Sequence, residues 1–170
     1  MEIIEILLNI IIDKQAKIQY PQRLMSQRHP TQNEVMMLVT TNTLNRKPIF
    51  SNDAYAREAI ECLYRVQNQH PFLLYGFVIM LDHCHLLMQI LEPGKISNTI
   101  SAFKSGLAHD LGIGPIWQRR FDNRIVKNAY RALKYIHMNP VKADLVEKPE
   151  DYPWSSASGR WDVTELYGDF

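Results

Sequence analysis

The chain has 170 residues, of which 46% are hydrophobic and 22% charged, a composition typical of a globular protein and not of a disordered one. This length suits one domain and excludes a (β/α)₈ barrel, which needs about 250 residues. The net charge is +1, from 19 basic and 18 acidic residues, so a nucleic-acid partner would have to be held by a local basic patch. Cys62 and Cys84 form no spacing framework and are expected to be reduced thiols.

The N-terminal residues are apolar but lack the features of a targeting or membrane segment. Residues 1–12 carry two glutamates, have no basic start and are too short to span a bilayer. We therefore expect no signal peptide, no membrane partner and a cytoplasmic location. Residues 1–33 are interpreted as an extension and connector, residues 34–156 as the main domain, and residues 157–170 as an acidic C-terminal tail.

Hydrophobic periodicity and turn residues predict seven elements in the order βαββαβα. They are a strand at 34–43, a helix at 52–69 capped by Ser51, strands at 72–80 and 83–91, a helix from Ser97 to Leu111, a strand at 116–121 and a helix at 125–138. The first six follow the split βαβ pattern, which predicts an α+β, ferredoxin-like (RRM-like) fold. Such a fold has an antiparallel sheet with helices on one face, here with an additional C-terminal helix. The later DYPWSS segment is expected to fold back on the body.

The expected strand HCHLLMQI begins with two histidines two residues apart. Because side chains alternate along a strand, His83 and His85 share one face, which we expect to be the face without helices. Cys84 belongs to the opposite, apolar face. Neighbouring imidazoles on a rigid strand are a half-site for a divalent metal, although a chance pair of histidines near a turn explains the pattern equally well.

The second pattern is an uneven distribution of charge. Residues 117–134 hold six basic residues and one acid, a net charge of +5, whereas residues 144–170 have a net charge of −5. A basic segment of this kind suits contacts to a phosphate backbone. The commoner meaning of such a run is a solvated helix face, and composition alone favours that interpretation.

Three polar residues of the last predicted helix follow one another at intervals of four. Arg131, Tyr135 and Asn139 therefore share one face. A guanidinium, a phenol and an amide in one row suit a site that handles a phosphodiester. The alternative is that Tyr135 is a partly buried packing residue.

Four segments in this order resemble one known family. LDHCHLLM, IWQRRFDNRIV, KYIHMNPVKADLV and DYPWSS resemble the single-tyrosine HUH transposases, and most closely the REP-associated tyrosine transposases. The resemblance runs from about Val35 to Ser156. The histidine pair alone is unspecific, whereas the order of the four segments is specific.

The resemblance implies an enzyme that cleaves single-stranded DNA at hairpin (REP-like) sequences and transfers the strand, in DNA transposition or REP element mobilisation. His83 and His85 match the histidines that hold Mg²⁺ or Mn²⁺, and Asn139 matches a polar third ligand. Tyr135 matches the nucleophile that forms a covalent 5′-phosphotyrosine. The resemblance leaves open whether the chain acts as a monomer or as a homodimer with exchanged tyrosine helices.

Six basic residues are candidates for contacts to the DNA phosphates: Lys104, Arg119, Arg120, Arg124, Lys127 and Arg131. Two other functions compete with the transposase. One is a catalytically silent binder of structured DNA or RNA with the same fold. The other is an unrelated metal hydrolase, which would need a carboxylate ligand beside the histidines. Asp82 is adjacent to them, but strand alternation predicts that it points to the opposite face.

Overall fold

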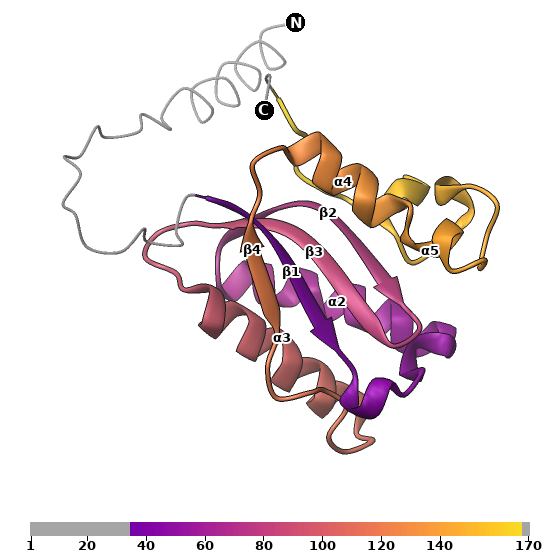
Figure 1. The fold of residues 1–170 in the computed structure, drawn as a ribbon. Helices are drawn as coiled ribbons and strands as arrows, with labels where there is room; N and C mark the ends of the chain where they lie inside the picture. Colours follow the sequence, from indigo (N-terminus) through magenta and orange to yellow (C-terminus); the bar gives the residue numbers. More distant parts are fainter. Residues whose placement is uncertain (1–34, 168–170) are drawn as a thin grey trace, which may run out of the picture. The chain divides into compact units, whose positions relative to one another are not determined.

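A four-stranded sheet organises the part of the chain that the computed structural model describes, residues 35–167 (Figure 1). Its strands are β1 (Met36–Asn42), β2 (Phe72–Met80), β3 (His83–Ile90) and β4 (Asp122–Ile125). The helices are α2 (Asp53–Gln69), α3 (Ile96–Leu111), α4 (Ala129–His137) and α5 (Asn139–Lys142). The interpretation of residues 1–33 as an extension and connector lies outside the described residues.

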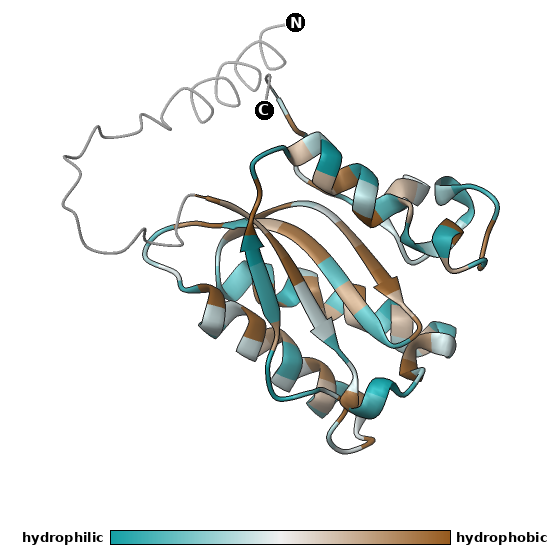
Figure 2. Cartoon of the chain, in the orientation of Figure 1, coloured by the Kyte–Doolittle hydropathy of each residue, from teal (hydrophilic) through white to brown (hydrophobic). Residues whose placement is uncertain are grey.

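The strands lie in the order β2-β3-β1-β4, and each pairs antiparallel with its neighbours. This order confirms the predicted ferredoxin-like α+β fold. Helices α2 and α3 lie together on one face of the sheet (Figure 1). The main core lies between these two helices and the sheet, and Cys84, Leu86 and Met88 of β3 are fully buried in it. Figure 2 shows the matching pattern, with apolar residues along β2 and in parts of β1 and β3, and polar residues in β4.

The opposite face of the sheet is covered by α4, and this differs from the expectation of a face without helices. A second apolar cluster forms there, in which Ile136 of α4 packs with Leu38, Val78 and Leu87 of the sheet. Leu133 lies directly over Gly76 of β2, so closely that a β-carbon at Gly76 would overlap its side chain. Glycine at this position therefore permits the close approach of helix and sheet.

The C-terminal segment folds back on the body, as predicted. The amide of Ile79 donates to the carbonyl of Trp154 at 2.8 Å, and the hydroxyl of Tyr152 donates to the carbonyl of Ile79 at 2.9 Å. The hydroxyl of Ser156 accepts from the amide of Phe77 at 3.0 Å and lies 2.9 Å from Nε2 of His137. Because His137 ends α4, Ser156 links that helix to β2.

Two predicted elements are shifted along the chain. The strand expected at 116–121 forms only an isolated bridge between Thr43 and Trp117, and β4 starts after it. Trp117 instead packs its ring against Phe50 and Phe103, which fixes this segment by side-chain packing. The last long helix starts at Ala129 and not at 125, because the residues before it pair with β1.

The helix caps also differ from the predicted ones. Asn52 caps α2 by accepting from the amide of Ala54 at 2.9 Å, in place of the predicted Ser51. Asn128 caps α4 by accepting from the amide of Arg131 at 2.7 Å. Helix α3 begins after Lys95 without a side-chain cap. Within residues 35–167, no helix combines the length and the apolar character needed to cross a membrane.

Replacing Gly76 with alanine is predicted to destabilise the docked position of α4. The new methyl group overlaps Leu133, so we expect the free energy of unfolding to fall by about 1 kcal/mol or more, as for overpacked cores. Urea denaturation measures the change. The double variant Gly76→Ala/Leu133→Ala should be no less stable than Leu133→Ala alone, and an equal loss in both backgrounds would contradict the predicted overlap.

Candidate active site

The two histidines lie side by side at the start of β3, directly after the tight turn that joins it to β2. Their ring centroids are 4.8 Å apart and the rings meet edge to face. The side chain of His83 is 15% exposed, and His85 is buried. As predicted, Cys84 between them points to the opposite face, where it is fully buried in the main core.

Each histidine has its Nδ1 atom engaged by a neighbouring polar group. Nδ1 of His83 lies 2.6 Å from Oδ1 of Asp82. Nδ1 of His85 lies 2.8 Å from Oγ1 of Thr40, its register partner on β1. Such contacts orient an imidazole ring and leave Nε2 as the atom that can bind a cation.

Asp82 does not point to the opposite face, and the expectation from strand alternation was wrong. It lies in the turn before β3, where the alternation of a strand does not apply. Its carboxylate bridges His83 and Arg46, whose Nε lies 2.8 Å from Oδ2. Among the described residues, no three His, Cys, Asp or Glu side chains gather as metal ligands. Because Asp82 contacts Nδ1 of His83 and the guanidinium of Arg46, its position suits a residue that orients His83 and not a ligand of the same cation.

Burial makes both histidines neutral at pH 7. It lowers the pKa of His85 to about 4, and positive charge on His83 when it is protonated, on Arg124 and on Arg46 acts in the same direction. Burial also lowers the pKa of His83, although Asp82 opposes this shift. The neutral imidazole is the form of histidine that binds a metal ion.

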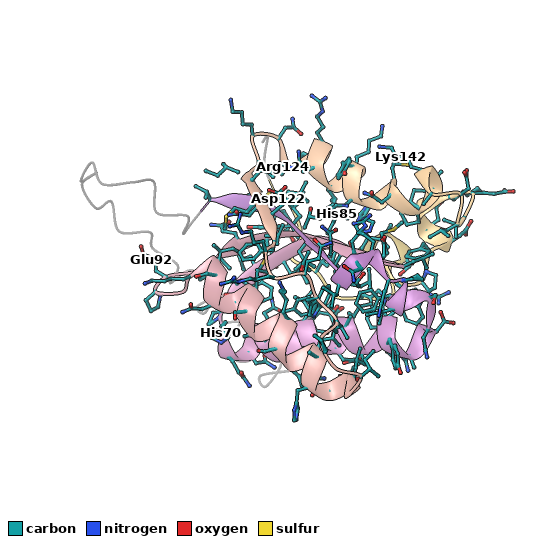
Figure 3. All side chains as sticks on the ribbon, turned by 60° about the horizontal axis from the view of Figure 1, so that its bottom comes forward. His70, His85, Glu92, Asp122, Arg124 and Lys142 are labelled. Carbon is teal, nitrogen blue, oxygen red and sulfur yellow. The ribbon has the colours of Figure 1, made fainter. Side chains whose placement is uncertain are left out.

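Helix α4 places Tyr135 beside the histidines of its own chain. The ring centroids of Tyr135 and His85 are 5.5 Å apart, and Tyr135 is 37% exposed, so its ring is accessible from solvent. The ammonium group of Lys142, on α5, lies 5.1 Å from the centroid of the tyrosine ring. Figure 3 shows Lys142 and His85 on the same side of the sheet as Arg124.

Asn139 closes the end of α4. Its side-chain Nδ2 donates to the carbonyl oxygens of Tyr135 at 2.7 Å and Ile136 at 3.3 Å. These bonds hold Asn139 one turn after Tyr135 and leave its Oδ1 as an oxygen that can bind a cation. Asn139 is thus bonded to the backbone of Tyr135, whereas His85 contacts the ring of Tyr135.

The predicted phosphate contacts fall into three groups. Arg124 is opposite Leu38 in the sheet register and therefore shares the face of the histidines. Lys104 is partly buried, and its ammonium group donates to the carbonyls of Gln118 at 2.5 Å and Arg119 at 3.1 Å. The remaining candidates are exposed on the loops beside β4 or on α4: Arg119, Arg120, Lys127 and Arg131.

Sequence reasoning missed three residues of this site: Thr40, Arg46 and Lys142. Lys142 is seven residues after Tyr135, a spacing that returns to the same helical face. The helix predicted at 125–138 ends before it, but the chain resumes helical geometry at Asn139 as α5. The contacts of Thr40 and Arg46 depend on strand pairing and on a loop, and no local spacing indicates them.

Comparison with known proteins identifies the class of protein. The family model described as "Transposase IS200 like" matches residues 31–139, and the chain belongs to this family. Among characterised relatives, the REP-associated tyrosine transposase of Escherichia coli (strain K12) is 30% identical over 123 residues, which are 69% of this chain and 73% of that protein.

A solved structure shows the same fold. It is that of a REP-associated tyrosine transposase bound to a REP hairpin. The match has a TM-score of 0.67 at 24% sequence identity and covers 86% of this chain and 93% of the other. The sequence comparison confirms the resemblance stated from the four segments, and the structural match confirms the architecture.

The buried histidines predict that the protein loses stability in acid. The unfolded chain binds a proton at His85 near pH 6.5, whereas the folded chain does so near pH 4. This contribution is fully present above about pH 6.5 and is lost as the pH falls towards 4, by up to about 3 kcal/mol. Burial lowers the pKa of His137 as well, which adds to the effect in the same direction.

Urea denaturation between pH 7.5 and 4.5, with EDTA present, measures this dependence. The variant His85→Gln should show a flatter decline than the wild-type chain. Parallel curves for the two proteins would contradict the assignment of the acid loss to His85.

Proposed function

We propose that this chain cleaves single-stranded DNA beside hairpin (REP-like) sequences and transfers the cut strand through a covalent 5′-phosphotyrosine, in DNA transposition or REP element mobilisation. The observation that carries the proposal is the distance of 5.5 Å between the rings of Tyr135 and His85 within one chain. It brings a nucleophile to the pair of histidines suited to a cation, and membership of the transposase family supports the same chemistry.

The covalent step is an exchange of one phosphate ester for another. The phenolic oxygen of Tyr135 attacks phosphorus, the bond from phosphorus to the 3′ oxygen breaks, and the phenolic proton ends on the released 3′ hydroxyl. The 5′ phosphate stays attached to Tyr135. A second 3′ hydroxyl then attacks the phosphotyrosine and joins a new strand. Because the ester energy is retained, the reaction needs no nucleotide triphosphate.

The residues present fit a divalent cation, Mg²⁺ or Mn²⁺. Two neutral imidazoles have their Nδ1 atoms engaged, so Nε2 of His83 and of His85 would hold it, with Oδ1 of Asn139 as a third ligand. When bound, the cation polarises a phosphate oxygen and neutralises charge that develops there. Lys142 and Arg124 add fixed positive charge near Tyr135 and His85.

The proposed partner is a single-stranded hairpin DNA. The structural neighbour is bound to a REP hairpin, and the local charge of +5 in residues 117–134 suits phosphate contacts. Because histidines and tyrosine of one chain lie together, a monomer contains the residues that the chemistry needs. The homodimer with exchanged helices stays a prediction.

The second candidate is a silent binder of structured DNA or RNA. It needs the fold and the basic residues but not the position of the tyrosine. The presence of His83, His85, Tyr135 and Asn139, with the tyrosine ring against His85, favours the enzyme. Binding of hairpin DNA without a covalent adduct would favour the binder.

Tyr135→Phe is predicted to abolish covalent attachment and to leave DNA binding unchanged. The change removes one oxygen and keeps the ring against His85. The assay incubates the protein with Mn²⁺ and a pool of hairpin oligonucleotides with randomised loops and unpaired flanks, and then detects adducts that survive denaturation. The wild-type chain should form adducts and EDTA should prevent them, whereas Tyr135→Phe should form none.

Tyr130 supplies the matched control on the same helix. It is 49% exposed, and its hydroxyl donates to the carbonyl of Leu166 at 3.3 Å and not to the histidine site. Tyr130→Phe should therefore form adducts at the wild-type rate. Adducts from Tyr135→Phe together with their loss in Tyr130→Phe would assign the nucleophile to Tyr130 and refute the proposal.

The basic residues are predicted to control the salt dependence of binding. Each lost phosphate contact should lower the slope of log affinity against log salt by about 0.7 for single-stranded DNA. Arg119→Ala/Arg120→Ala/Arg124→Ala should therefore lower the slope by about 2. Fluorescence anisotropy over a range of salt concentrations measures it, and an unchanged slope would place the DNA elsewhere on the protein.

A further inference from the structure

A turn after β1 brings Arg46 against the turn that precedes the histidines. Its Nε lies 2.8 Å from Oδ2 of Asp82, and its Nη1 donates to Oδ1 of Asn42. Asn42 is the register partner of His83. The guanidinium group therefore extends from the end of β1 to the carboxylate that contacts His83, and its planar fork of donors suits both partners at once.

Backbone bonds hold the same two turns together. The amide of Thr43 donates to the carbonyl of Asp82 at 2.9 Å, and the hydroxyl of Thr43, a fully buried residue, lies 2.9 Å from the same oxygen. The amide of Phe50 donates to the carbonyl of Leu81 at 2.9 Å. The contact between Arg46 and Asp82 is therefore supported by the fold around it and is not a chance pairing of two surface side chains.

Arg46 occupies a backbone conformation that an arginine rarely adopts. Its φ is 56° and that of Asn45 is 55°, and both values lie in the left-handed region that favours glycine. A glycine at position 46 would adopt this conformation without strain, so the arginine side chain is present at a cost in stability. Backbone strain of this kind is concentrated at functional sites.

The carboxylate of Asp82 determines which nitrogen of the neutral His83 ring carries the hydrogen. A carboxylate paired with a guanidinium accepts hydrogen bonds and donates none, so Nδ1 of His83, 2.6 Å from Oδ1, bears the hydrogen. The lone pair then lies on Nε2. The environment of His85 is different, because its Nδ1 faces the hydroxyl of Thr40 at 2.8 Å and a hydroxyl can donate or accept. Only the partner of His83 thus imposes one tautomer.

We propose that Arg46 is a positioning residue that acts on His83 through Asp82. Its two contacts hold the carboxylate in the orientation that keeps the hydrogen on Nδ1 of His83 and leaves the lone pair of Nε2 directed into the site. The inference rests on the proposed function in one respect, because it takes Nε2 of His83 as a ligand of the cation. Removing the polar partner of a metal-binding histidine typically lowers metal affinity by about 10- to 100-fold.

The sign of the effect separates positioning from simple charge. Arg46 is itself a cation close to the histidines, so a role of its charge alone predicts that its removal tightens the binding of Mn²⁺. A positioning role predicts that its removal weakens this binding. The variant Arg46→Gly makes the distinction sharp, because it removes the side chain and at the same time relieves the left-handed backbone.

Isothermal titration calorimetry of Mn²⁺ binding to the full chain without DNA tests the proposal. The Kd should rise about tenfold in Asp82→Ala and about threefold or more in Arg46→Gly. The matched control Lys47→Met removes an exposed cation from the same turn, and its Kd should equal the wild-type value or lie slightly below it. In thermal denaturation, Arg46→Gly should melt no lower than the wild-type chain, which excludes a loss of folding as the cause.

A second measurement determines the tautomer of His83 without any metal. Nitrogen-15 NMR of the metal-free chain at neutral pH distinguishes a hydrogen on Nδ1 from one on Nε2, and the His83 signals are assigned by their loss in His83→Gln. The wild-type ring should carry the hydrogen on Nδ1. Asp82→Ala should move it to Nε2, its preferred position in free histidine, and Arg46→Gly should populate both forms.

Two results would overturn the positioning role. They are Mn²⁺ binding in Arg46→Gly that is as tight as in the wild-type chain or tighter, and a wild-type His83 with its hydrogen on Nε2. Failure of the wild-type chain to bind Mn²⁺ would instead refute the cation of the proposed function. In that case the tautomers of the wild-type chain and of Arg46→Gly would still decide whether Arg46 acts on His83.

Discussion

The packing of α4 across the sheet is the constraint on which the whole site depends. The histidines are fixed by β3, but the tyrosine reaches them only because its helix lies on the same face. Ile136 is fully buried in the apolar cluster there, Leu133 occupies the space above Gly76, and His137 meets Ser156 of the C-terminal segment. A residue with a side chain at position 76 would push the helix outward. Tyr135, the proposed nucleophile, is thus positioned by contacts on the other faces of its helix, and the DYPWSS segment supports that helix through Ser156.

The electrostatic character of the site follows from where its charges lie and not from their total. The chain has a net charge of +1, yet Arg46 and Arg124 lie near the buried His85 and Lys142 lies against the ring of Tyr135. Burial keeps the imidazoles uncharged, which is the form that the proposed cation requires, and the neighbouring positive charges would favour the phosphate of the proposed substrate. Seven of the 18 acidic residues lie after position 143, where only two basic residues accompany them. One face of the protein can therefore bind a polyanion although the whole chain is almost neutral.

Sequence patterns predicted correctly the side-chain directions that depend on local periodicity. They failed where contacts between distant segments determine the conformation. Alternation along β3 separated His83 and His85 from Cys84 correctly, and helical spacing joined Tyr135 to Asn139. Alternation failed for Asp82, because a turn residue can rotate its carboxylate towards the neighbouring histidine. The prediction of a strand at 116–121 was wrong because the ring of Trp117 packs against two phenylalanines and holds this segment as a loop. The contact of Thr40 with His85 depends on the pairing of β1 with β3, and the sequence of one strand does not indicate which strand it pairs with.

The two edge strands of the sheet, β2 and β4, are protected from pairing with other chains in different ways. Along β2, the returning chain satisfies outer backbone groups, as in the bonds of Ile79 to Trp154 and of Thr164 to Leu74. At the other edge, β4 is only four residues long and carries Asp122 and Arg124. A short, charged edge strand is a poor template for a strand from another molecule, so both edges resist uncontrolled sheet extension. Growth of the sheet from either edge is therefore a poor route to aggregation for this chain.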